Sequence, residues 1–554
     1  MKASLISVLL AVAGFLVAAA RINHGLVDSG LPSGPGLTPD ESFNIQQGVY
    51  LFDAFMQHGP ILFTRSGATE VFGSRDYLPD HPPLGRVVLG AAHQMTSWTL
   101  GGARKAAFDV PAARLGSCLL FAMTVLLLAE FSRRRFGIAT AVAAAVALML
   151  MPRVVGHARL ASLETATSLA WLAACVPLWV WWTEPLPPTS RQCLISGLLW
   201  GVLLLTKVQG ILLPPLVVGW ALWRFRSQAV RPLVLWGLTG AVVFFVGWPW
   251  LWLDPIANMM QYLGRATDRS TLYVWYFGQR YADKAVPWHF PFVMTLITLP
   301  LILLIGFVAN LFRRSRTPSQ MLMLLSVVWP LIVFAVPGVP VYDGCRLFLI
   351  IMPPLALLAG RGLCLLAGFP SEPIRHQTPD QAPGTPSARS VSARLLIIGL
   401  LLLLAVRPAV DVLQAFALDS YSLVVGGPAG AEWLGMESSY WADGMNRDFW
   451  QQVPEDSVVY VAPICHQFLL LDLDRLVPVV AERNIRLRPF EYDPEEQRGL
   501  ILLIHRLADL RPMLRTVPSG ATVVAEARYR NVVLARLIDT TEATWPELPD
   551  WPDR

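Results

Sequence analysis

The chain has 554 residues, of which 54% are hydrophobic and only 15% are charged, and its mean hydropathy is +0.49. A soluble domain carries about a quarter of charged residues, so this composition excludes an ordinary soluble protein. The net charge of +5 comes from arginines that stand between apolar segments, which excludes a continuous basic surface for nucleic acid. Apolar segments of about 17–25 residues, each long enough to cross a bilayer as a helix, recur along the chain. The sequence therefore predicts a polytopic α-helical membrane protein.

The apolar segments predict about eleven transmembrane spans. The first resembles a signal peptide, but the many later spans favour an uncleaved helix. A large first outer loop covers residues 21–113, and within it Leu84–Leu100 is expected to form an interfacial or re-entrant helix. The predicted spans are 4–20, 114–131, 137–152, 163–182, 192–206, 209–223, 232–253, 290–312, 319–337, 347–368 and 394–410.

Arginines between the spans indicate their orientation through the positive-inside rule. A cytoplasmic N-terminus places all four arginine groups on the cytoplasmic side. The linker 371–392, rich in Pro, Ser, Gln and Gly, is then also cytoplasmic. The four groups are Arg133–Arg135, Arg224–Arg231, Arg313–Arg316 and Arg375–Arg394.

The composition changes after Arg407-Pro408, where the long apolar segments end. Residues 411–554 are predicted to form a soluble α/β domain outside the cytoplasm, and from this location alone we hypothesise that it binds or positions an acceptor molecule. Short runs rich in β-branched residues predict its strands. These runs are Val458–Val461, Ile501–Ile504, Thr522–Ala525 and Val532–Ala535.

Charged and polar residues of the outer loops are expected to converge on one pocket that opens outward near the membrane surface. Charges beside lipid are costly unless they face water, a cation or a substrate. A carboxylate can deprotonate an attacking hydroxyl, and Arg or Lys can neutralise a phosphate leaving group. Such a pocket suits displacement at a sugar carbon that is attached to a lipid-linked phosphate. The residues are Asp40, Glu41, Asp80, His81, Arg86, His157, Arg159, Glu164, Lys207, Tyr342, Asp343 and Arg346.

Several motifs resemble those of the GT-C membrane glycosyltransferases, and in particular the bacterial relatives of protein O-mannosyltransferases and of the lipid A aminoarabinose transferase. The resemblance covers most of residues 1–410 and depends on the order and sidedness of the motifs, because no single one is diagnostic. Arg86 and Glu164 stand where this family more often has Lys and Asp, but they keep the charge. The motifs are Asp40-Glu41, His81–Arg86, His157–Glu164, Leu203–Lys207 and Cys345–Phe348 followed by Pro353-Pro354.

This resemblance implies a GT-C-like fold for residues 1–410, with a catalytic first outer loop. It implies a multi-pass enzyme of the inner cell membrane that transfers a sugar from a polyprenyl-phosphate donor to a hydroxyl acceptor of the cell envelope, with inversion. Asp40 is then the general base, with Glu41 as the rival candidate. Arg346, together with Arg159 or Lys207, stabilises the leaving phosphate.

Other interpretations stay open at this point. Asp40 follows Thr38-Pro39 and could simply start a helix, His81 could order its loop, and Arg159 could reach toward lipid headgroups. No cofactor is required by the resemblance, although a divalent cation held by Asp40, Glu41 and His81 is an alternative. A transporter or flippase of a lipid-linked saccharide is the alternative function, but the sequence lacks the internal repeats that many transporters have.

Overall fold

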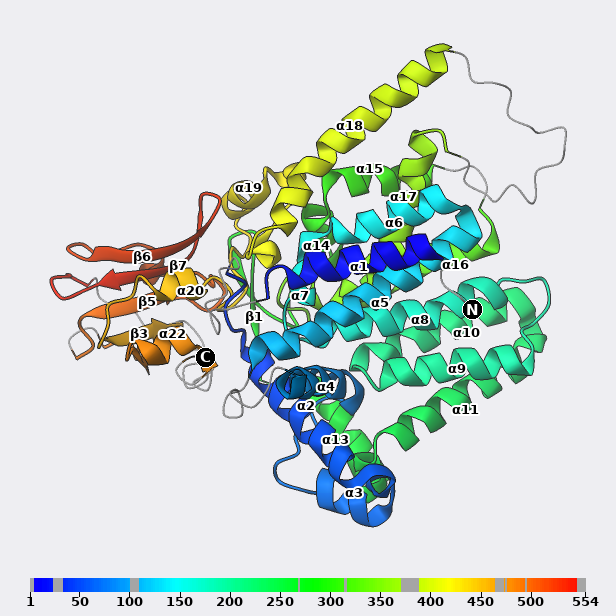
Figure 1. The fold of residues 1–554 in the computed structure, drawn as a ribbon, viewed down its shortest axis with the longest axis horizontal. Coiled ribbons are helices and arrows are strands. Elements are labelled where there is room, and N and C mark those ends of the chain that lie inside the picture. The colour runs from blue at the N-terminus through cyan, green and yellow to red at the C-terminus, as the bar shows by residue number, and fades with distance from the viewer. Residues whose placement is uncertain are drawn as a thin grey trace.

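The computed structural model describes residues 4–22, 33–99, 109–267, 270–312, 316–369, 388–463, 473, 476–493 and 496–545. It has two parts, a large helical bundle and a C-terminal β-sheet at one end of it (Figure 1). The predicted cytoplasmic linker lies outside the described residues up to position 387, so its prediction stays untested.

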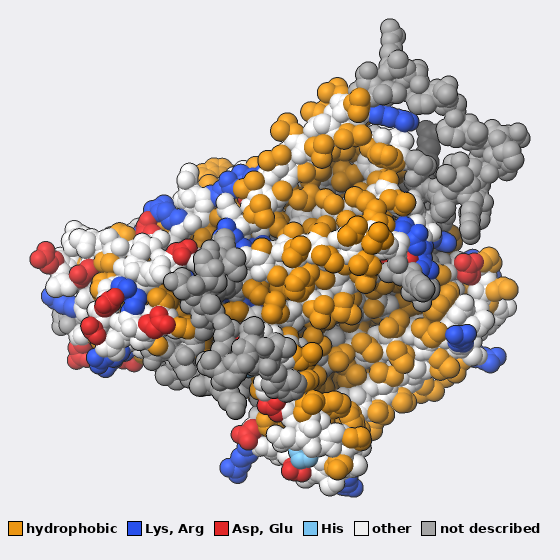
Figure 2. Space-filling view, viewed as in Figure 1, with side chains coloured by type: hydrophobic (Ala, Val, Ile, Leu, Met, Phe, Trp, Pro, Cys, Tyr) orange, Lys and Arg blue, Asp and Glu red, His pale blue; other side chains and the backbone are white. Residues whose placement is uncertain are grey.

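Helices form the bundle, and every predicted span contains at least one of them. Within the described ranges, four helical segments are long and apolar enough to cross a membrane, or six if two bent pairs count as one span each. Hydrophobic side chains cover the bundle between charged ends, as expected for a multi-pass membrane protein (Figure 2). The helices are α1 (Leu5–Ala19), α5 (Val110–Phe136), α6 (Ile138–Met149), α8 (Glu164–Trp181), α9 (Ser190–Leu204), α10 (Leu213–Phe225), α11 (Val230–Gly247), α16 (Pro318–Phe334), α17 (Met352–Leu366) and α18 (Ala388–Val412).

Two predicted spans are bent in the structure. Helices α14 (Phe290–Thr298) and α15 (Leu301–Leu311) meet at 117°, so the segment 290–312 is two helices rather than one. Pro300 lies at the break, where it removes a backbone donor and pushes Leu299 out of helical geometry. Helix α6 likewise meets the short α7 (Pro152–Ala158) at 72°.

The predicted first outer loop, residues 21–113, is mostly helical where the structure describes it, and it includes α2 (Pro39–His58), α3 (Arg65–Phe72) and α4 (Pro83–Thr99), the last of which corresponds to the predicted helix Leu84–Leu100. Helix α2 begins with a capping box between Thr38 and Glu41 and with Pro39 in its first turn. Helices α2 and α4 cross at two glycines, since a Cβ on Gly90 would lie 2.0 Å from the carbonyl oxygen of Gly48. This close crossing positions the first turn of α2, which carries Asp40.

The C-terminal domain contains a mixed five-stranded sheet in the order β4-β3-β5-β7-β6. Strand β3 is parallel to β4 and β5, whereas β7 is antiparallel to both β5 and β6. All four predicted strands are present. Strand β4 was not predicted, because its four residues are polar at alternate positions and end in Pro489. The strands are β3 (Val458–Ala462), β4 (Arg486–Pro489), β5 (Leu500–Ile504), β6 (Thr522–Tyr529) and β7 (Val532–Asp539).

A small hairpin and a shared hydrophobic core connect the sheet to the bundle. The hairpin of β1 (Tyr273–Tyr276) and β2 (Gln279–Ala282) was not predicted, and its turn residues Phe277 and Gly278 both have positive φ. Residues of the bundle and of the sheet share one buried cluster, which includes Ile45, Leu89 and Val110 together with Val459 and Leu502. Strand β5 therefore belongs to the same buried core as α2, α4 and the start of α5.

Candidate active site

A cavity of about 150 Å³ lies between the first turn of α2 and the C-terminal domain. Segments far apart in the sequence contribute to it: the start of α2, the loop before α4, the connection after α9, the segment before the helical turn η4 (Arg346–Ile351), and residues 440–441. Six of the predicted site residues line it. Its lining residues are Thr38, Pro39, Asp40, His81, Lys207, Leu272, Tyr342, Asp343, Arg346, Tyr440 and Trp441.

Two cations of this cavity share one buried carboxylate. Oε1 of Glu164 accepts hydrogen bonds from Nζ of Lys207 at 2.6 Å and from Nε of Arg346 at 2.7 Å. The Glu164 side chain is only 2% exposed, whereas that of Asp40, which pairs with Nη2 of Arg346, is 47% exposed. Glu164 therefore fixes the two cations from behind, and Asp40 is the carboxylate that an incoming ligand meets.

Asp343 connects Arg346 to the C-terminal domain. Its Oδ2 accepts from Nη1 of Arg346 at 3.0 Å, and its Oδ1 accepts from Nη2 of Arg506 at 2.7 Å and from Nε1 of Trp441 at 3.1 Å. Burial alone would raise the pKa of Asp343, but Arg506 and Arg346 outweigh burial and hold the pKa below its ordinary value. Asp343 is therefore a carboxylate. The role of Arg506 was not predicted, because nothing in its local sequence indicates a partner 163 residues away.

His81 contributes a neutral imidazole to the cavity. Burial lowers the pKa of His81 to about 4, against the opposing effect of Asp80. The neighbouring Asp80 pairs with Arg86 through two contacts of 2.5 and 2.9 Å, and Arg86 also donates to the Asn44 side chain and the Leu78 carbonyl. Asp80 and Arg86 do not line the cavity; they hold the loop that carries His81.

Glu41 lies in a different environment from its neighbour Asp40. Its side chain is fully buried and accepts two hydrogen bonds of 2.7 Å from the equally buried Arg114. It also accepts from the backbone N–H groups of Ala161 at 2.8 Å and of Thr38 at 3.0 Å. Glu41 thus caps α2 and ties it to α5 and to the segment before α8, outside the cavity.

Two further predicted residues lie behind the cavity wall. Arg159 is buried and donates to the backbone carbonyls at the ends of α1 and α18, namely those of Val17, Ala18, Val412 and Gln414. The ring of His157 is 5.4 Å from the ring of Tyr440, which does line the cavity. Arg159 therefore connects helix ends, and His157 supports the wall from behind.

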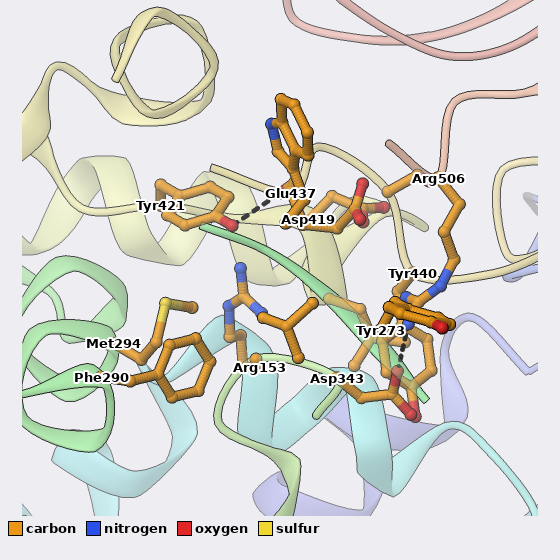
Figure 3. A pocket seen from close by; sticks show the side chains of 15 residues that line it. Arg153, Tyr273, Phe290, Met294, Asp343, Asp419, Tyr421, Glu437, Tyr440 and Arg506 are labelled. Carbon is orange, nitrogen blue, oxygen red and sulfur yellow. Dashed lines mark hydrogen bonds and ion pairs between the residues drawn. The ribbon is translucent and has the colours of Figure 1, made fainter. Parts of the chain in front are cut away.

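A second, smaller cavity of about 30 Å³ shares Asp343 and Tyr440 with the first (Figure 3). The Tyr421 hydroxyl there donates to the backbone carbonyl of Glu437 at 2.6 Å, and Arg153 lies over the Tyr421 ring at 4.6 Å. Burial raises the pKa of Glu437 to about 7. Protein groups therefore line the side of Asp343 that faces this second cavity.

The described residues contain no ready-made set of ligands for the divalent cation that was considered as an alternative. No group of three or more His, Cys, Asp or Glu residues there is arranged to hold a metal ion. Of the three side chains considered for this role, Glu41 is already bonded to Arg114 and lies outside the cavity. The involvement of a metal stays an untested alternative.

Comparison with known proteins gives one family. Residues 81–252 match the family described as dolichyl-phosphate-mannose-protein mannosyltransferase. This segment, about a third of the chain, includes His81, Glu164 and Lys207. Comparison with curated protein sequences gives no match.

Solved structures of one protein share a loose likeness with the whole chain. The crystal structure of ArnT from Cupriavidus metallidurans bound to undecaprenyl phosphate is 15% identical, with a TM-score of 0.46 over 96% of this chain and 97% of that one. The same protein in the apo state is 15% identical, with a TM-score of 0.47 over 98% of both chains. Through the family match at residues 81–252, the resemblance to GT-C membrane glycosyltransferases that the sequence motifs indicate is confirmed.

Proposed function

We propose that the protein transfers a sugar from a polyprenyl-phosphate donor to a hydroxyl acceptor on the extracytoplasmic side of the cell membrane, with inversion at the anomeric carbon. One observation carries the proposal: an accessible carboxylate, Asp40, lies beside two cations, Lys207 and Arg346, that Glu164 holds in place. The family to which residues 81–252 are similar is described by a lipid-phosphate sugar donor, which supports the choice of donor class.

The donor phosphate binds at Lys207 and Arg346. Lys207 and Arg346 share the single charge of Glu164, and Arg346 shares Asp343 with Arg506, so the two cations can accommodate a further negative charge on the cavity side. Without a donor, Asp40 supplies that charge through Arg346. A phosphodiester donor takes this place on Arg346 and leaves Asp40 available as a base. Buried, fixed cations of this kind stabilise charge that develops on a leaving group.

The transfer step uses Asp40 as the general base. Its carboxylate takes the proton of the acceptor hydroxyl while the hydroxyl oxygen bonds to the anomeric carbon. The bond from that carbon to the phosphate oxygen breaks on the opposite face, and the released phosphate gains a negative charge beside Lys207 and Arg346. The neutral His81 and the Tyr342 hydroxyl line the same cavity and provide hydrogen-bonding groups for the sugar.

The positive-inside rule supports the orientation. With the N-terminus in the cytoplasm, arginine groups such as Arg133–Arg135 at the end of α5 lie inside, and the cavity and the C-terminal domain lie outside. Nucleotide sugars are absent there, which favours a lipid-carried donor. The acceptor is a hydroxyl of a protein, lipid or glycan in the cell envelope.

A transfer assay tests the proposal. The purified full chain is incubated with radiolabelled polyprenyl-phosphate sugars and a cell-envelope extract, alongside Asp40→Asn and the matched control Asp76→Asn. Asp76 is an exposed acid of the same loop that does not line the cavity. We expect Asp40→Asn to lower the rate by about 10²–10⁴-fold, the usual contribution of a general base, and Asp76→Asn to match the unchanged protein.

Two results would count against the proposal. Transfer by Asp40→Asn at the rate of the unchanged protein would remove Asp40 as the base. Movement of a lipid-linked saccharide across a vesicle membrane without transfer from any donor would favour the flippase alternative.

A further inference from the structure

Arg506, which follows β5 in the C-terminal domain, contacts Asp343 in the wall of the cavity. Its Nη2 donates to Oδ1 of Asp343 at 2.7 Å, and both side chains are almost completely buried. The other oxygen of Asp343 accepts from Arg346 at 3.0 Å. Asp343 therefore lies between two arginines, one from the C-terminal domain and one from the bundle.

Further contacts within the C-terminal domain fix Arg506 itself. Its guanidinium lies 4.0 Å from the ring centre of Trp441, and its Nε donates to Asp509 at 3.0 Å. The next two backbone N–H groups, of Leu507 and Ala508, donate to the Glu437 carboxylate at 2.7 and 3.0 Å. Arg506 is thus held in a single orientation toward Asp343.

The backbone on both sides of this contact is strained. Asp343 has a φ of 55° and Trp441 a φ of 57°, values in the left-handed region. This region is uncommon for any residue with a side chain and markedly unfavourable for a bulky one such as Trp. Such conformations persist only where the surrounding contacts determine them, and they cluster at functional sites. The fold maintains them while Asp343 joins Arg346, Arg506 and Trp441.

We propose that Arg506 is a positioning residue, which through Asp343 fixes the guanidinium of Arg346 for the donor phosphate. The C-terminal domain is then part of the donor site. The role of Arg346 toward phosphate rests on the proposed function, whereas the coupling between Arg506 and Arg346 does not. Without Arg506, Asp343 loses a partner and Arg346 is no longer held in a fixed orientation by a fully paired carboxylate.

Binding of undecaprenyl phosphate to the full chain in detergent tests the functional part. We expect Arg506→Gln to weaken binding about tenfold, since misplacing a binding group costs that much or more, and Arg506→Lys to restore part of it.

The matched control is Arg530→Gln, because Arg530 also joins the C-terminal domain to the bundle, through Asp411 at 2.5 Å, but lies away from the cavity. We expect the affinity of Arg530→Gln for undecaprenyl phosphate to stay within about twofold of that of the unchanged protein. Equal losses in Arg506→Gln and Arg530→Gln would overturn the inference, because a general loosening of the domain would then explain both.

A second measurement needs no ligand and so separates this inference from the proposed function. Thermal unfolding is recorded for Arg506→Gln, Arg346→Gln and the double variant. Each single variant leaves Asp343 one arginine, whereas the double variant leaves it none. We therefore expect the melting temperature of the double variant to fall by more than the sum of the decreases in the two single variants. Additive losses would refute the coupling, whereas failure of the unchanged protein to bind undecaprenyl phosphate, with the coupling intact, would instead count against the proposed function.

Discussion

Asp40 and Glu41 are adjacent in the chain, yet their carboxylates pair with different arginines in different surroundings. Asp40 faces the cavity and pairs with Arg346, whereas Glu41 is fully buried against Arg114. Successive residues of a helix point about 100° apart, so the first turn of α2 presents one acid to the cavity and one to the protein interior. The acidic pair thus combines a group for chemistry with a group for structure.

The first prediction separates these two acids by their effect on stability. Glu41→Gln leaves a buried Arg114 without its opposite charge, which should cost about 3–5 kcal/mol of unfolding free energy. Asp40→Asn breaks only a partly exposed pair and should cost about 1 kcal/mol or less. Thermal unfolding in detergent measures both losses of stability. Glu70→Gln is the control, because the Glu70 side chain is 67% exposed. Similar losses for the two variants would show that Glu41 has no special structural role.

The second prediction concerns Arg159, which the sequence suggested as a phosphate contact. Because Arg159 joins the ends of α1 and α18 through four backbone carbonyls, Arg159→Lys should leave buried acceptors unpaired. The expected loss is about 1–3 kcal/mol of unfolding free energy, with little change in the affinity of the folded protein for undecaprenyl phosphate. If Arg159→Lys instead bound undecaprenyl phosphate much more weakly at an unchanged free energy of unfolding, Arg159 would be a phosphate contact after all.

The third prediction concerns the crossing of α2 and α4. Gly90→Ala would place a Cβ 2.0 Å from the carbonyl oxygen of Gly48, so the two helices must separate. We expect a loss of about 1–3 kcal/mol and a lower transfer rate, because α2 carries Asp40. Gly219→Ala in α10, where a Cβ meets nothing within 4 Å, is the matched control and should not destabilise the protein. If both variants behave alike, the close approach of α2 and α4 is not needed.

The fourth prediction is a dependence of stability on pH. Burial raises the pKa of Asp443 to about 7 and that of Glu437 to about 7, and burial together with Asp443 raises the pKa of Asp419. In the unfolded chain these acids have pKa values of about 4, so between about pH 4 and pH 7 they bind more protons in the folded state than in the unfolded state. The contribution of these acids to the unfolding free energy should therefore fall as the pH rises through this range.

Melting temperatures from pH 5 to pH 8 check this dependence. Relative to the unchanged protein, Asp443→Asn, which stays neutral throughout, should gain melting temperature as the pH rises, whereas the exposed Asp76→Asn should show no such gain. Identical slopes for Asp443→Asn and the unchanged protein would show that Asp443 does not hold a proton in the folded state.

The sequence predicted the spans and much of the cavity lining, because hydropathy and arginine sidedness depend on the membrane rather than on distant contacts. Asp40, His81, Lys207 and Arg346 could be placed on one face for this reason, and the structure brings them together. The bend at Pro300 could also have been expected, since proline disrupts a helix.

The remaining features depend on contacts that no local pattern encodes. Glu41 meets an arginine 73 residues away, and Asp343 meets one 163 residues away. Arg159 has the same charge as Lys207, but its surroundings direct it to backbone carbonyls instead of the cavity. Charge and sidedness therefore predict which residues are available, and tertiary packing decides which of them reach the ligand.

The position of Arg506 in the chain has a consequence for biosynthesis. A chain emerging from the ribosome completes its N-terminal parts first. The pair between Glu41 and Arg114 can form early, but the last partner of Asp343 is made only after nine-tenths of the chain has been synthesised. A nascent or truncated protein can thus insert its spans while its donor site is still incomplete. Under the proposed function, transfer can begin only after Arg506 has been made and has paired with Asp343.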